Sequence, residues 1–567
     1  MKFNTALLHG DFQGEPNTGA TTTPVYQSSA FAHESAEKLE KIFHNQAPGY
    51  SYTRISNPTV DAFEKRVTAL EGGVASVACA SGMAALYNAF CNILRSGDEI
   101  VSSASLYGGS IDLFRDLEAF GITTHYVENN DLAAFEAKTN EHTRLYFAET
   151  IGNPRLDVTD ITALANLAHE HQVPLIIDNT VATAFLVKPL SLGADIVMNS
   201  SSKYINGHSN SISGIITDRG RFKCDVDKYP VMAVFKKFGP FAYTAKLRNG
   251  LFRNTGACLS PQNAFYNCIG LETLGIRMER ICDNAAELAR FFVREYSDVT
   301  VNYPGLESSP WHEIAKKQFK DRFGGILTIR TGSKKRAFEI INALKLPLII
   351  SNIGDTKTLV IHPESTLNVH STPEEKRDAG VFDDLIRISV GIEDIEDLIE
   401  DFRQAMDQSK AKSKWRKQTM AKIDYAALKK GGFMRQKQKG FFSLRIQVVG
   451  GNLTAENIKA VADVAEKYGK GYVHMTSRQG IEIPFINFED IEEVRAKLAD
   501  GGVKPGVCGP RVRTVTACQG SEICPSGCID TYSLAKKLDE HYFGRELPHK
   551  FKFGVTGCQN NCLKAEE

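Results

Sequence analysis

Short apolar runs alternate with helical patterns between about residue 58 and residue 250 of this chain. Four of these runs have the length of a strand and are largely apolar along their course: 75–79, 99–102, 143–147 and 175–177. Such strands are typical of a sheet that helices cover on both faces, so the pattern predicts a mainly parallel α/β sheet. The full chain has 567 residues, too many for one hydrophobic core, and we expect two or three globular units.

Composition divides the chain further. The first residues are rich in Gly, Pro, Thr and Asn, which favours an arm, whereas Lys and Arg recur from residue 409 to residue 440, as in a solvated linker. For the second half of that basic segment, contact with an anionic ligand is the alternative. We expect an N-terminal arm, a large domain, a smaller α+β domain, a basic linker and a C-terminal α+β unit over residues 1–57, 58–255, 256–407, 408–440 and 441–567.

Charge and hydropathy exclude several classes of protein. The formal net charge is zero, which argues against a general nucleic-acid-binding protein. The chain has no apolar run of about 18 residues and no apolar signal core at its N-terminus, so we expect no membrane contact and a cytoplasmic location. In that reducing compartment, the six cysteines of the first half are expected to be buried free thiols: Cys79, Cys91, Cys224, Cys258, Cys268 and Cys282.

A lysine follows one predicted strand, and an acid ends the strand before it. Lys203 comes just after the apolar run 194–198, and Asp178 closes the run 173–178. Pyridoxal phosphate (PLP) needs a lysine that bonds to its aldehyde and an acid that keeps its ring nitrogen protonated. The hydroxyls of Ser200 and Ser202, beside the lysine, are suited to donate to phosphate oxygens. This combination predicts a PLP site at the ends of these strands.

Two further segments fit the same cofactor. Ser81, Gly82 and Met83 follow a predicted strand and open a helix, where free backbone N–H groups and a glycine suit phosphate. Tyr107 is a candidate for stacking on the pyridine ring, with an ordinary core tyrosine as the alternative.

Residues 1 to about 407 resemble the Cys/Met-metabolism PLP enzymes, the cystathionine γ-synthase-like family of fold type I. The matching stretches occur in the family's order: 50–59, 81–83, 149–154, 178, 200–203 and 385–393. The resemblance implies that Lys203 carries the cofactor and moves protons, that Asp178 pairs with the ring nitrogen, and that Tyr107 stacks on the ring. It assigns the phosphate to Ser81, Gly82, Met83, Ser200 and Ser202.

The same resemblance assigns four more residues and an oligomer. Tyr52 and Arg54 would hold the phosphate of a neighbouring subunit, which implies a homodimer or a tetramer. Asn153 would lie near the 3′-oxygen of the cofactor. Arg387 would bind the substrate α-carboxylate, for which a guanidinium fork is well suited; a surface ion pair is the alternative, but apolar strand residues flank this arginine.

Within that family the chain is most similar to the O-acetylhomoserine sulfhydrylases, in residues 106–110, 248–261, 351–355 and 361–363. This likeness places Ser351 and Asn352 with Arg387 at the substrate. It implies replacement of the acetate of O-acetylhomoserine by sulfide, giving homocysteine, and a free thiol could take the place of sulfide. Gly109 stands where methionine γ-lyases usually have a cysteine, which argues mildly against a lyase. A cystathionine γ-synthase remains an alternative, because one scaffold serves several γ-replacements.

Six further cysteines lie in the last sixty or so residues. Cys518 and Cys524 form one pair, and Cys558 and Cys562 form another. Four thiolates in a cytosolic protein usually indicate zinc or an iron–sulfur cluster, and the five residues between Cys518 and Cys524 make zinc less favourable. Clustered structural cysteines are the alternative.

The stretches 516–524, 549–555 and 557–562 resemble the sulfite and nitrite reductases, which carry sirohaem coupled to a [4Fe–4S] cluster. The resemblance implies that the two cysteine pairs hold the cluster and that Cys562 bridges to the sirohaem iron. Sirohaem carries many carboxylates and needs a basic surrounding. The likeness favours Arg445, Arg478, Lys550 and Lys552 for sirohaem or sulfite, ahead of Arg511 and Arg513. Cys508 and Cys528 do not fit this pattern and are expected to be free thiols.

The sequence ends five residues after Cys562, where relatives continue, so we expect the reductase-like unit to be incomplete. Three hypotheses follow for the whole chain. In the first, the tail reduces sulfite with an external electron donor and supplies sulfide to the PLP unit. In the second, the tail is an inactive scaffold. In the third, it is an iron–sulfur sensor that regulates the PLP unit, which would be a sulfhydrylase, a cystathionine γ-synthase or a γ-lyase.

Overall fold

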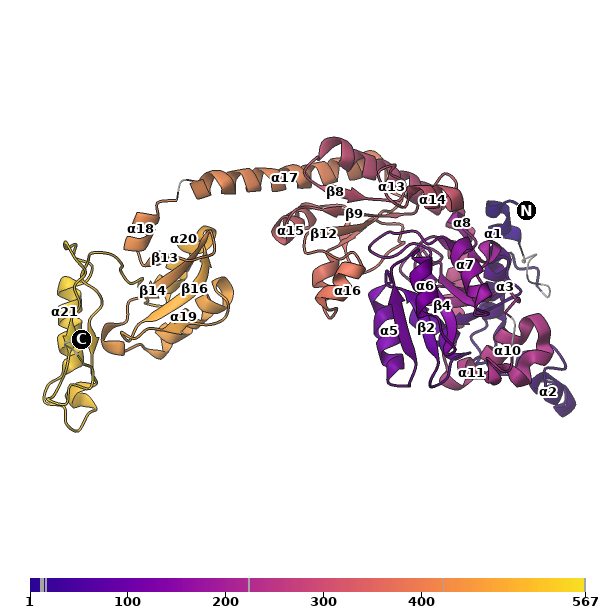
Figure 1. Ribbon diagram of the computed structural model, residues 1–567, viewed down its shortest axis with the longest axis horizontal. Helices are drawn as coiled ribbons and strands as arrows, with labels where there is room; N and C mark the ends of the chain where they lie inside the picture. The colour runs from indigo at the N-terminus through magenta and orange to yellow at the C-terminus, as the bar shows by residue number, and fades with distance from the viewer. Residues whose placement is uncertain (11–14, 16–17, 223–224, 422, 565–567) are drawn as a thin grey trace. The chain divides into compact units, whose positions relative to one another are not determined.

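The computed structural model describes residues 1–10, 15, 18–222, 225–421 and 423–564. The chain divides into two compact units, Met1–Lys410 and Ala411–Glu567, and each is treated by itself below (Figure 1). Among the described residues, no helix combines the length and the hydropathy needed to cross a membrane.

A seven-stranded sheet forms the centre of the first unit. Its strands are, in chain order, β1 (Ala75–Cys79), β2 (Glu99–Ser103), β3 (Thr123–Val127), β4 (Thr143–Glu149), β5 (Leu175–Asp178), β6 (Ile196–Asn199) and β7 (Gly214–Asp218). The spatial order is β1-β7-β6-β5-β4-β2-β3. The neighbours from β6 to β3 run parallel, and β7 is antiparallel to both β1 and β6. The predicted mainly parallel sheet is confirmed.

Both faces of this sheet are buried, which explains the apolar strands. In β4, Tyr146 and Ala148 contribute to one core cluster, while Leu145 and Phe147 contribute to the other. Side chains alternate between the faces of a strand, so a strand covered on both sides needs apolar residues at successive positions. The surrounding helices are α3 (Pro58–Glu71), α4 (Gly82–Cys91), α5 (Gly108–Glu118), α6 (Leu132–Lys138), α7 (Ile161–Glu170), α8 (Thr183–Leu186), α9 (Pro189–Leu192), η1 (Pro230–Phe241), α10 (Ala242–Asn249) and α11 (Leu251–Thr255).

A smaller α+β region follows in the same unit. It begins with two helices, α12 (Pro261–Glu272) and α13 (Leu274–Glu295), which meet at Thr273. A five-stranded sheet has the order β10-β11-β12-β9-β8. Its elements and neighbours are β8 (Thr300–Asn302), α14 (His312–Phe319), β9 (Ile326–Arg330), α15 (Lys334–Ala343), β10 (Leu348–Ile349), β11 (Leu359–Ile361), η2 (Pro363–Ser365), α16 (Pro373–Asp378), β12 (Leu385–Ser389) and α17 (Ile395–Ala421).

The structure differs from the predicted arm and linker. Within residues 1–57, helix α1 (Phe3–His9) buries Leu7 in the core of the first unit, whereas α2 (Ala36–Phe43) buries no residue. Within residues 408–440, α17 continues to Ala421, α18 (Tyr425–Lys430) follows, and β13 (Phe433–Arg435) pairs with the next strand. The end of the basic segment therefore belongs to the sheet of the second unit, a correction to the linker boundary.

The second unit begins with a four-stranded sheet in the order β13-β14-β16-β15. Helix α19 (Ala455–Tyr468) follows Thr454, whose side chain accepts a hydrogen bond from Asn457 N in a capping box. The unit continues into a smaller region with a parallel pair of strands and a separate apolar cluster. The elements are β14 (Phe441–Ile446), η3 (Val449–Gly451), α19 (Ala455–Tyr468), β15 (His474–Met475), β16 (Ile481–Asn487), η4 (Phe488–Asp490), α20 (Ile491–Asp500), β17 (Thr516–Ala517), η5 (Gly520–Glu522), α21 (Thr531–Tyr542) and β18 (Gly554–Val555).

The cysteines of the first unit are free thiols where they are described. Cys79, Cys268 and Cys282 are buried, and Cys91 and Cys258 are half-buried; Cys224 lies outside the described residues. The expectation of burial is therefore met for three of these thiols.

Candidate functional site

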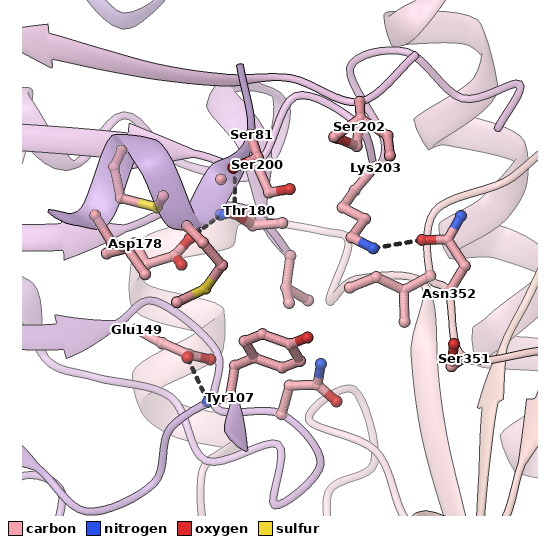
Figure 2. A pocket seen from close by; sticks show the side chains of 18 of the residues that line it. Ser81, Tyr107, Glu149, Asp178, Thr180, Ser200, Ser202, Lys203, Ser351 and Asn352 are labelled. Carbon is pink, nitrogen blue, oxygen red and sulfur yellow. Dashed lines mark hydrogen bonds between the residues drawn. The ribbon is translucent and has the colours of Figure 1, made fainter. Parts of the chain in front are cut away.

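A cavity of about 410 Å³ opens at the carboxyl ends of the parallel strands of the first unit (Figure 2). In open α/β sheets, ligands bind at this edge. Strands β4, β5 and β6 each deliver a residue at or just after their last position, namely Glu149, Asp178 and Ser200. The cavity collects most of the residues predicted for the cofactor and substrate: Ser81, Gly82, Met83, Tyr107, Asn153, Asp178, Ser200, Ser202, Lys203, Ser351, Asn352 and Arg387.

Lys203 lies in a turn after β6, where its backbone N–H donates to Ser200 O at 3.1 Å. Its Nζ donates to Oδ1 of Asn352, as Figure 2 shows. Burial, together with the positive charge of Arg387, lowers the pKa of this amine to about 8. A substantial fraction of the amine is therefore neutral near physiological pH, the form that attacks a carbonyl and accepts a proton.

Asp178 ends β5 inside the cavity wall. Burial raises its pKa to about 6, and hydrogen bonds from the hydroxyl and the backbone N–H of Thr180 oppose that rise. The N–H of Thr180 lies 2.9 Å from Oδ1 of Asp178. A buried carboxylate without a cationic partner is costly, and a protonated pyridine nitrogen supplies such a partner. The acid therefore fits the PLP ring.

The turn before α4 has the geometry of a phosphate cradle. Ser81 Oγ accepts from Ala84 N at 3.0 Å and caps the helix. A Cβ added at Gly82 would lie only 2.7 Å from the Cβ of Ser200, so the glycine permits this close approach. The helix amides thus face Ser200 across a short gap, and they fit a phosphate group. Ser202 Oγ instead donates to Ser213 O at 3.0 Å, which fixes the turn that carries Lys203.

Tyr107 is 41% exposed and lines the cavity, which excludes the alternative of a core tyrosine. Its backbone N–H donates to Oε1 of Glu149 at 2.6 Å (Figure 2). The sequence reasoning did not single out Glu149 as a site residue. An acid at the end of a strand that is otherwise apolar, 143–149, was the available signal.

Arg387 lies on β12 and is only 2% exposed, which excludes a surface ion pair. Its guanidinium donates to Oδ1 of Asn153 and to the backbone oxygen of Asn352, both at 3.1 Å. Its Nε has no hydrogen-bond partner among the described residues, and burial lowers the pKa of the guanidinium to about 10. A buried cation with spare donors and no acid beside it fits a carboxylate ligand.

Tyr52 and Arg54 do not line the cavity of their own chain. The Arg54 guanidinium lies 5.4 Å from the centre of the Tyr52 ring and donates to the backbone oxygen of Arg253. Both residues are exposed. The predicted role at the site of a second subunit thus stays a proposal.

Comparison with known protein families decides the class of the first unit. Residues 4–407 match the Cys/Met metabolism PLP-dependent enzyme family. The chain belongs to this family. The predicted family, its PLP cofactor and the fold type I architecture are confirmed.

Individual relatives cover the same part of the chain. A homocysteine synthase of Schizosaccharomyces pombe is 39% identical over 420 residues, which are 71% of this chain and 98% of that protein. An L-methionine gamma-lyase of Fusobacterium nucleatum is 39% identical over 393 residues, 69% of this chain and 94% of that protein. The crystal structure of a putative O-acetylhomoserine (thiol)-lyase of Campylobacter jejuni, which contains N′-pyridoxyl-lysine-5′-monophosphate, has a TM-score of 0.68 at 33% identity and covers 72% of this chain and 100% of its own.

The second unit matches two further families. Residues 434–501 match the nitrite/sulfite reductase ferredoxin-like half domain, and residues 508–567 match the nitrite and sulphite reductase 4Fe-4S domain. The predicted resemblance of the tail is confirmed.

The loops that carry the cysteines of the second unit meet at Gly557. Cys518 Sγ accepts from Gly557 N at 3.1 Å, and Cys528 N donates to Gly557 O at 2.8 Å. Cys518, Cys524 and Cys558 are half-buried and Cys562 is exposed. The described residues contain no group of three or more His, Cys, Asp or Glu side chains already placed to hold a metal ion. The match to the 4Fe-4S domain supports an iron–sulfur cluster in this unit, and its assignment to these four cysteines stays a proposal.

A basic cavity of about 270 Å³ lies elsewhere in the second unit. Its lining includes the four predicted cations and one ranked below them: Arg445, Arg478, Lys550, Lys552 and Arg513. By contrast, Arg511 forms an ion pair with Glu546 and does not line the cavity. A cavity lined by five cationic side chains is suited to an anionic ligand.

The charges around this cavity are poorly compensated. Arg445 pairs with Glu482 at 2.5 Å, but no acid is among the described residues that line the cavity. Burial and the charge of Arg513 lower the pKa of Arg478, and Arg478 in turn lowers the pKa of Lys552. An anion would relieve this mutual repulsion.

Proposed function

We propose that the first unit catalyses a PLP-dependent γ-replacement, in which sulfide displaces acetate from O-acetylhomoserine to give homocysteine. The observation that carries the proposal is a single cavity that brings together Lys203, Asp178 and the unpaired donors of buried Arg387. Relatives named homocysteine synthase and O-acetyl-L-homoserine sulfhydrylase, about 40% identical to this chain, support the choice of reaction.

When bound, the cofactor supplies an electron sink for the charge left at the substrate α-carbon. Lys203 holds the cofactor through its Nζ, and the substrate amine releases that nitrogen. The freed, neutral Nζ takes the proton from Cα and passes it on to the bound cofactor, which makes the amine neutral again. It then takes a proton from Cβ, and a pKa of about 8 permits both transfers. Acetate leaves from Cγ, hydrosulfide forms the new C–S bond there, and Lys203 returns the protons.

The other side chains orient the reactants. Asp178 stays ionised and holds the ring nitrogen in its protonated form. Arg387 binds the α-carboxylate through the donors that the protein leaves free, and Asn153 fixes the guanidinium plane from the other side. This clamp directs the Cα–H bond toward Lys203.

The test is homocysteine formation by the purified chain from O-acetylhomoserine and sulfide, measured by mass spectrometry. We expect Lys203→Ala to abolish the product and the visible absorbance of the bound cofactor. Lys236→Ala, at an exposed lysine that does not line the cavity, serves as the matched control and keeps both. Unchanged homocysteine formation by Lys203→Ala would reject the proposal.

A γ-lyase is the second candidate, because one relative carries the name L-methionine gamma-lyase. Gly109 argues against it. A Cβ at this position would lie 2.5 Å from Cε1 of Tyr107, so a cysteine there requires the Tyr107 ring to move. Methionine and cysteine are therefore the decisive alternative substrates. Release of methanethiol from methionine at a higher rate than homocysteine formation would assign a lyase. Formation of cystathionine from O-acetylhomoserine and cysteine would assign a cystathionine γ-synthase.

For the second unit we propose binding of sulfite in the basic cavity. Reduction of sulfite to sulfide needs six electrons, an electron-transfer cofactor and an external donor, and the proposal for this unit is limited to the binding step. Calorimetry should detect sulfite binding that weakens with salt and is lost in Arg478→Gln/Lys552→Gln. Lys467→Gln, at an exposed pair with Glu493, is the control. Equal binding by the double variant would overturn the assignment.

The cofactor content of the second unit has its own measurement. Iron and acid-labile sulfide are determined on chain purified without oxygen, together with the visible spectrum. Iron near four per chain would support the predicted [4Fe–4S] cluster, with rearranged loops, and added sirohaem bands would support sulfite reduction. Cofactor absorbance from PLP alone would support the scaffold hypothesis.

A further inference from the structure

Glu149 is a buried acid of the cavity to which the proposed mechanism gives no task. It ends β4, is 5% exposed and lines the cavity. Its Oε1 accepts the backbone N–H of Tyr107 at 2.6 Å, and the backbone N–H of Asn153 also acts as a donor to this carboxyl. A buried carboxyl that accepts hydrogen bonds from backbone N–H groups of two different loops holds these loops together.

The two loops carry different parts of the site. Tyr107 precedes α5, and its ring lies next to Glu149 in Figure 2. The side chain of Asn153 accepts from Arg387 at 3.1 Å. Contacts from one carboxyl therefore extend to the ring proposed to stack on the cofactor and to the guanidinium proposed to bind the substrate.

Glu149 also has an acid as its neighbour on the next strand. Glu149 and Asp178 are paired in register across β4 and β5. Burial, and then the charge of Asp178, raise the pKa of Glu149 well above its usual range. Thr180 donates to Asp178 through its hydroxyl and its backbone N–H, which opposes the effect of burial on the pKa of Asp178. Toward the loops, the Glu149 carboxyl acts as a hydrogen-bond acceptor.

We propose that Glu149 is a positioning residue, a buried carboxyl whose oxygens hold the loops of Tyr107 and Asn153 in place around the cofactor and the substrate clamp. It touches neither reacting atom and acts through these two residues. The expected effect on kcat/KM rests on the proposed γ-replacement, whereas the expected effect on PLP affinity does not.

The test compares Glu149→Gln, Glu149→Asp and Glu149→Ala. A glutamine keeps the length and one acceptor oxygen, so PLP affinity and kcat/KM should stay within about threefold of the wild type. Aspartate is one methylene shorter and leaves the Tyr107 N–H without its acceptor. We expect both Asp and Ala to weaken PLP binding and to lower kcat/KM by about 10- to 100-fold.

Glu393→Asp is the matched control. Glu393 accepts the backbone N–H of Thr358 in the small α+β region and does not line the cavity. The same shortening there should leave PLP affinity unchanged, even if thermal stability falls. Affinity is followed by titrating the apo-protein with PLP and reading visible circular dichroism, a signal that reports the fixed orientation of the bound ring.

Three results would overturn the proposal. They are a loss in Glu149→Gln as large as that in Glu149→Ala, unchanged PLP affinity and circular dichroism in Glu149→Asp, or an equal loss in Glu393→Asp. The titration needs no substrate turnover. A wild type that makes no homocysteine would therefore reject the proposed function, while the affinity series would still decide the role of Glu149.

Discussion

At the scale of single residues, Asn352 connects the base to the substrate clamp. Its Oδ1 accepts from Lys203 Nζ, its Nδ2 donates to Ser209 Oγ at 3.1 Å, and its backbone oxygen accepts from Arg387 at 3.1 Å. Ser209 in turn donates to the buried carboxylate of Asp355. A short chain of hydrogen bonds thus anchors the proposed base to a fixed charge.

Replacement of Asn352 tests this connection. We expect Asn352→Leu, which keeps the approximate size and removes both polar atoms, to lower kcat by about 10- to 100-fold, since the Lys203 amine loses its acceptor. KM for O-acetylhomoserine should change less, because the backbone oxygen that holds Arg387 remains. Steady-state kinetics separates the two constants, with Lys236→Ala, outside the cavity, as the control. A rise in KM as large as the expected fall in kcat, with kcat itself unchanged, would contradict the expectation.

The lowered pKa of Lys203 predicts how PLP attaches to the apo-protein. The neutral amine is the nucleophile, so the attachment rate should rise with pH and level off above about 8. Arg387 lowers this pKa by charge repulsion, and Arg387→Gln should therefore move the midpoint of the profile to higher pH. Stopped-flow absorbance after mixing with PLP measures the rate. A midpoint that stays fixed or moves to lower pH in Arg387→Gln would contradict the assignment.

At the scale of elements, the start of α4 depends on contact with the turn after β6. Gly82→Ala would place a Cβ 2.7 Å from the Cβ of Ser200, which forces the helix and the turn apart. We expect PLP affinity to fall by at least about tenfold, because the helix amides move away from the phosphate. Competition with inorganic phosphate in the same titration checks that this part of the site is affected. Unchanged affinity would show that the turn adapts without cost.

Sequence patterns predicted the elements that local rules determine. The strand 75–79 and the acid at the end of β5 follow from hydropathy, side-chain chemistry and chain order. The family resemblance supplied most residues of the cavity. The pairing of β13 with β14 and the antiparallel β7 depend on contacts between separate segments, and a basic composition concealed β13.

The same distinction explains the site residues that were missed or misplaced. Glu149 was overlooked because its partners, Tyr107 and Asp178, belong to other strands and loops. Arg513 was ranked below Arg478, although the fold brings both to one cavity. The spacing of the four terminal cysteines indicated a metal site, but spacing along the chain does not fix the distances between sulfurs, so the assignment of these cysteines stays a prediction that the iron measurement tests.

At the scale of the whole molecule, the site of one chain is proposed to need a second copy. The cavity contains Lys203 and the phosphate turn, whereas Tyr52 and Arg54 are exposed outside it. Residues proposed for the phosphate that do not reach their own cavity are suited to the cavity of a partner subunit. This arrangement would make each site a composite of two chains.

Mixing two inactive variants tests this composite site. Arg54→Ala lacks the donated arginine, and Lys203→Ala lacks the lysine of the main site. In a mixed dimer, one site combines the intact Lys203 of one chain with the intact Arg54 of the other. Random reassociation should then restore about a quarter of the wild-type rate of homocysteine formation, since half of the dimers are mixed and each has one intact site.

Restoration should fail when both substitutions are in the same chain and the partner is Lys203→Ala, because no site then has both groups. Activity that stays near zero in the first mixture, despite subunit exchange verified by mass spectrometry of tagged chains, would mean that Arg54 serves its own chain.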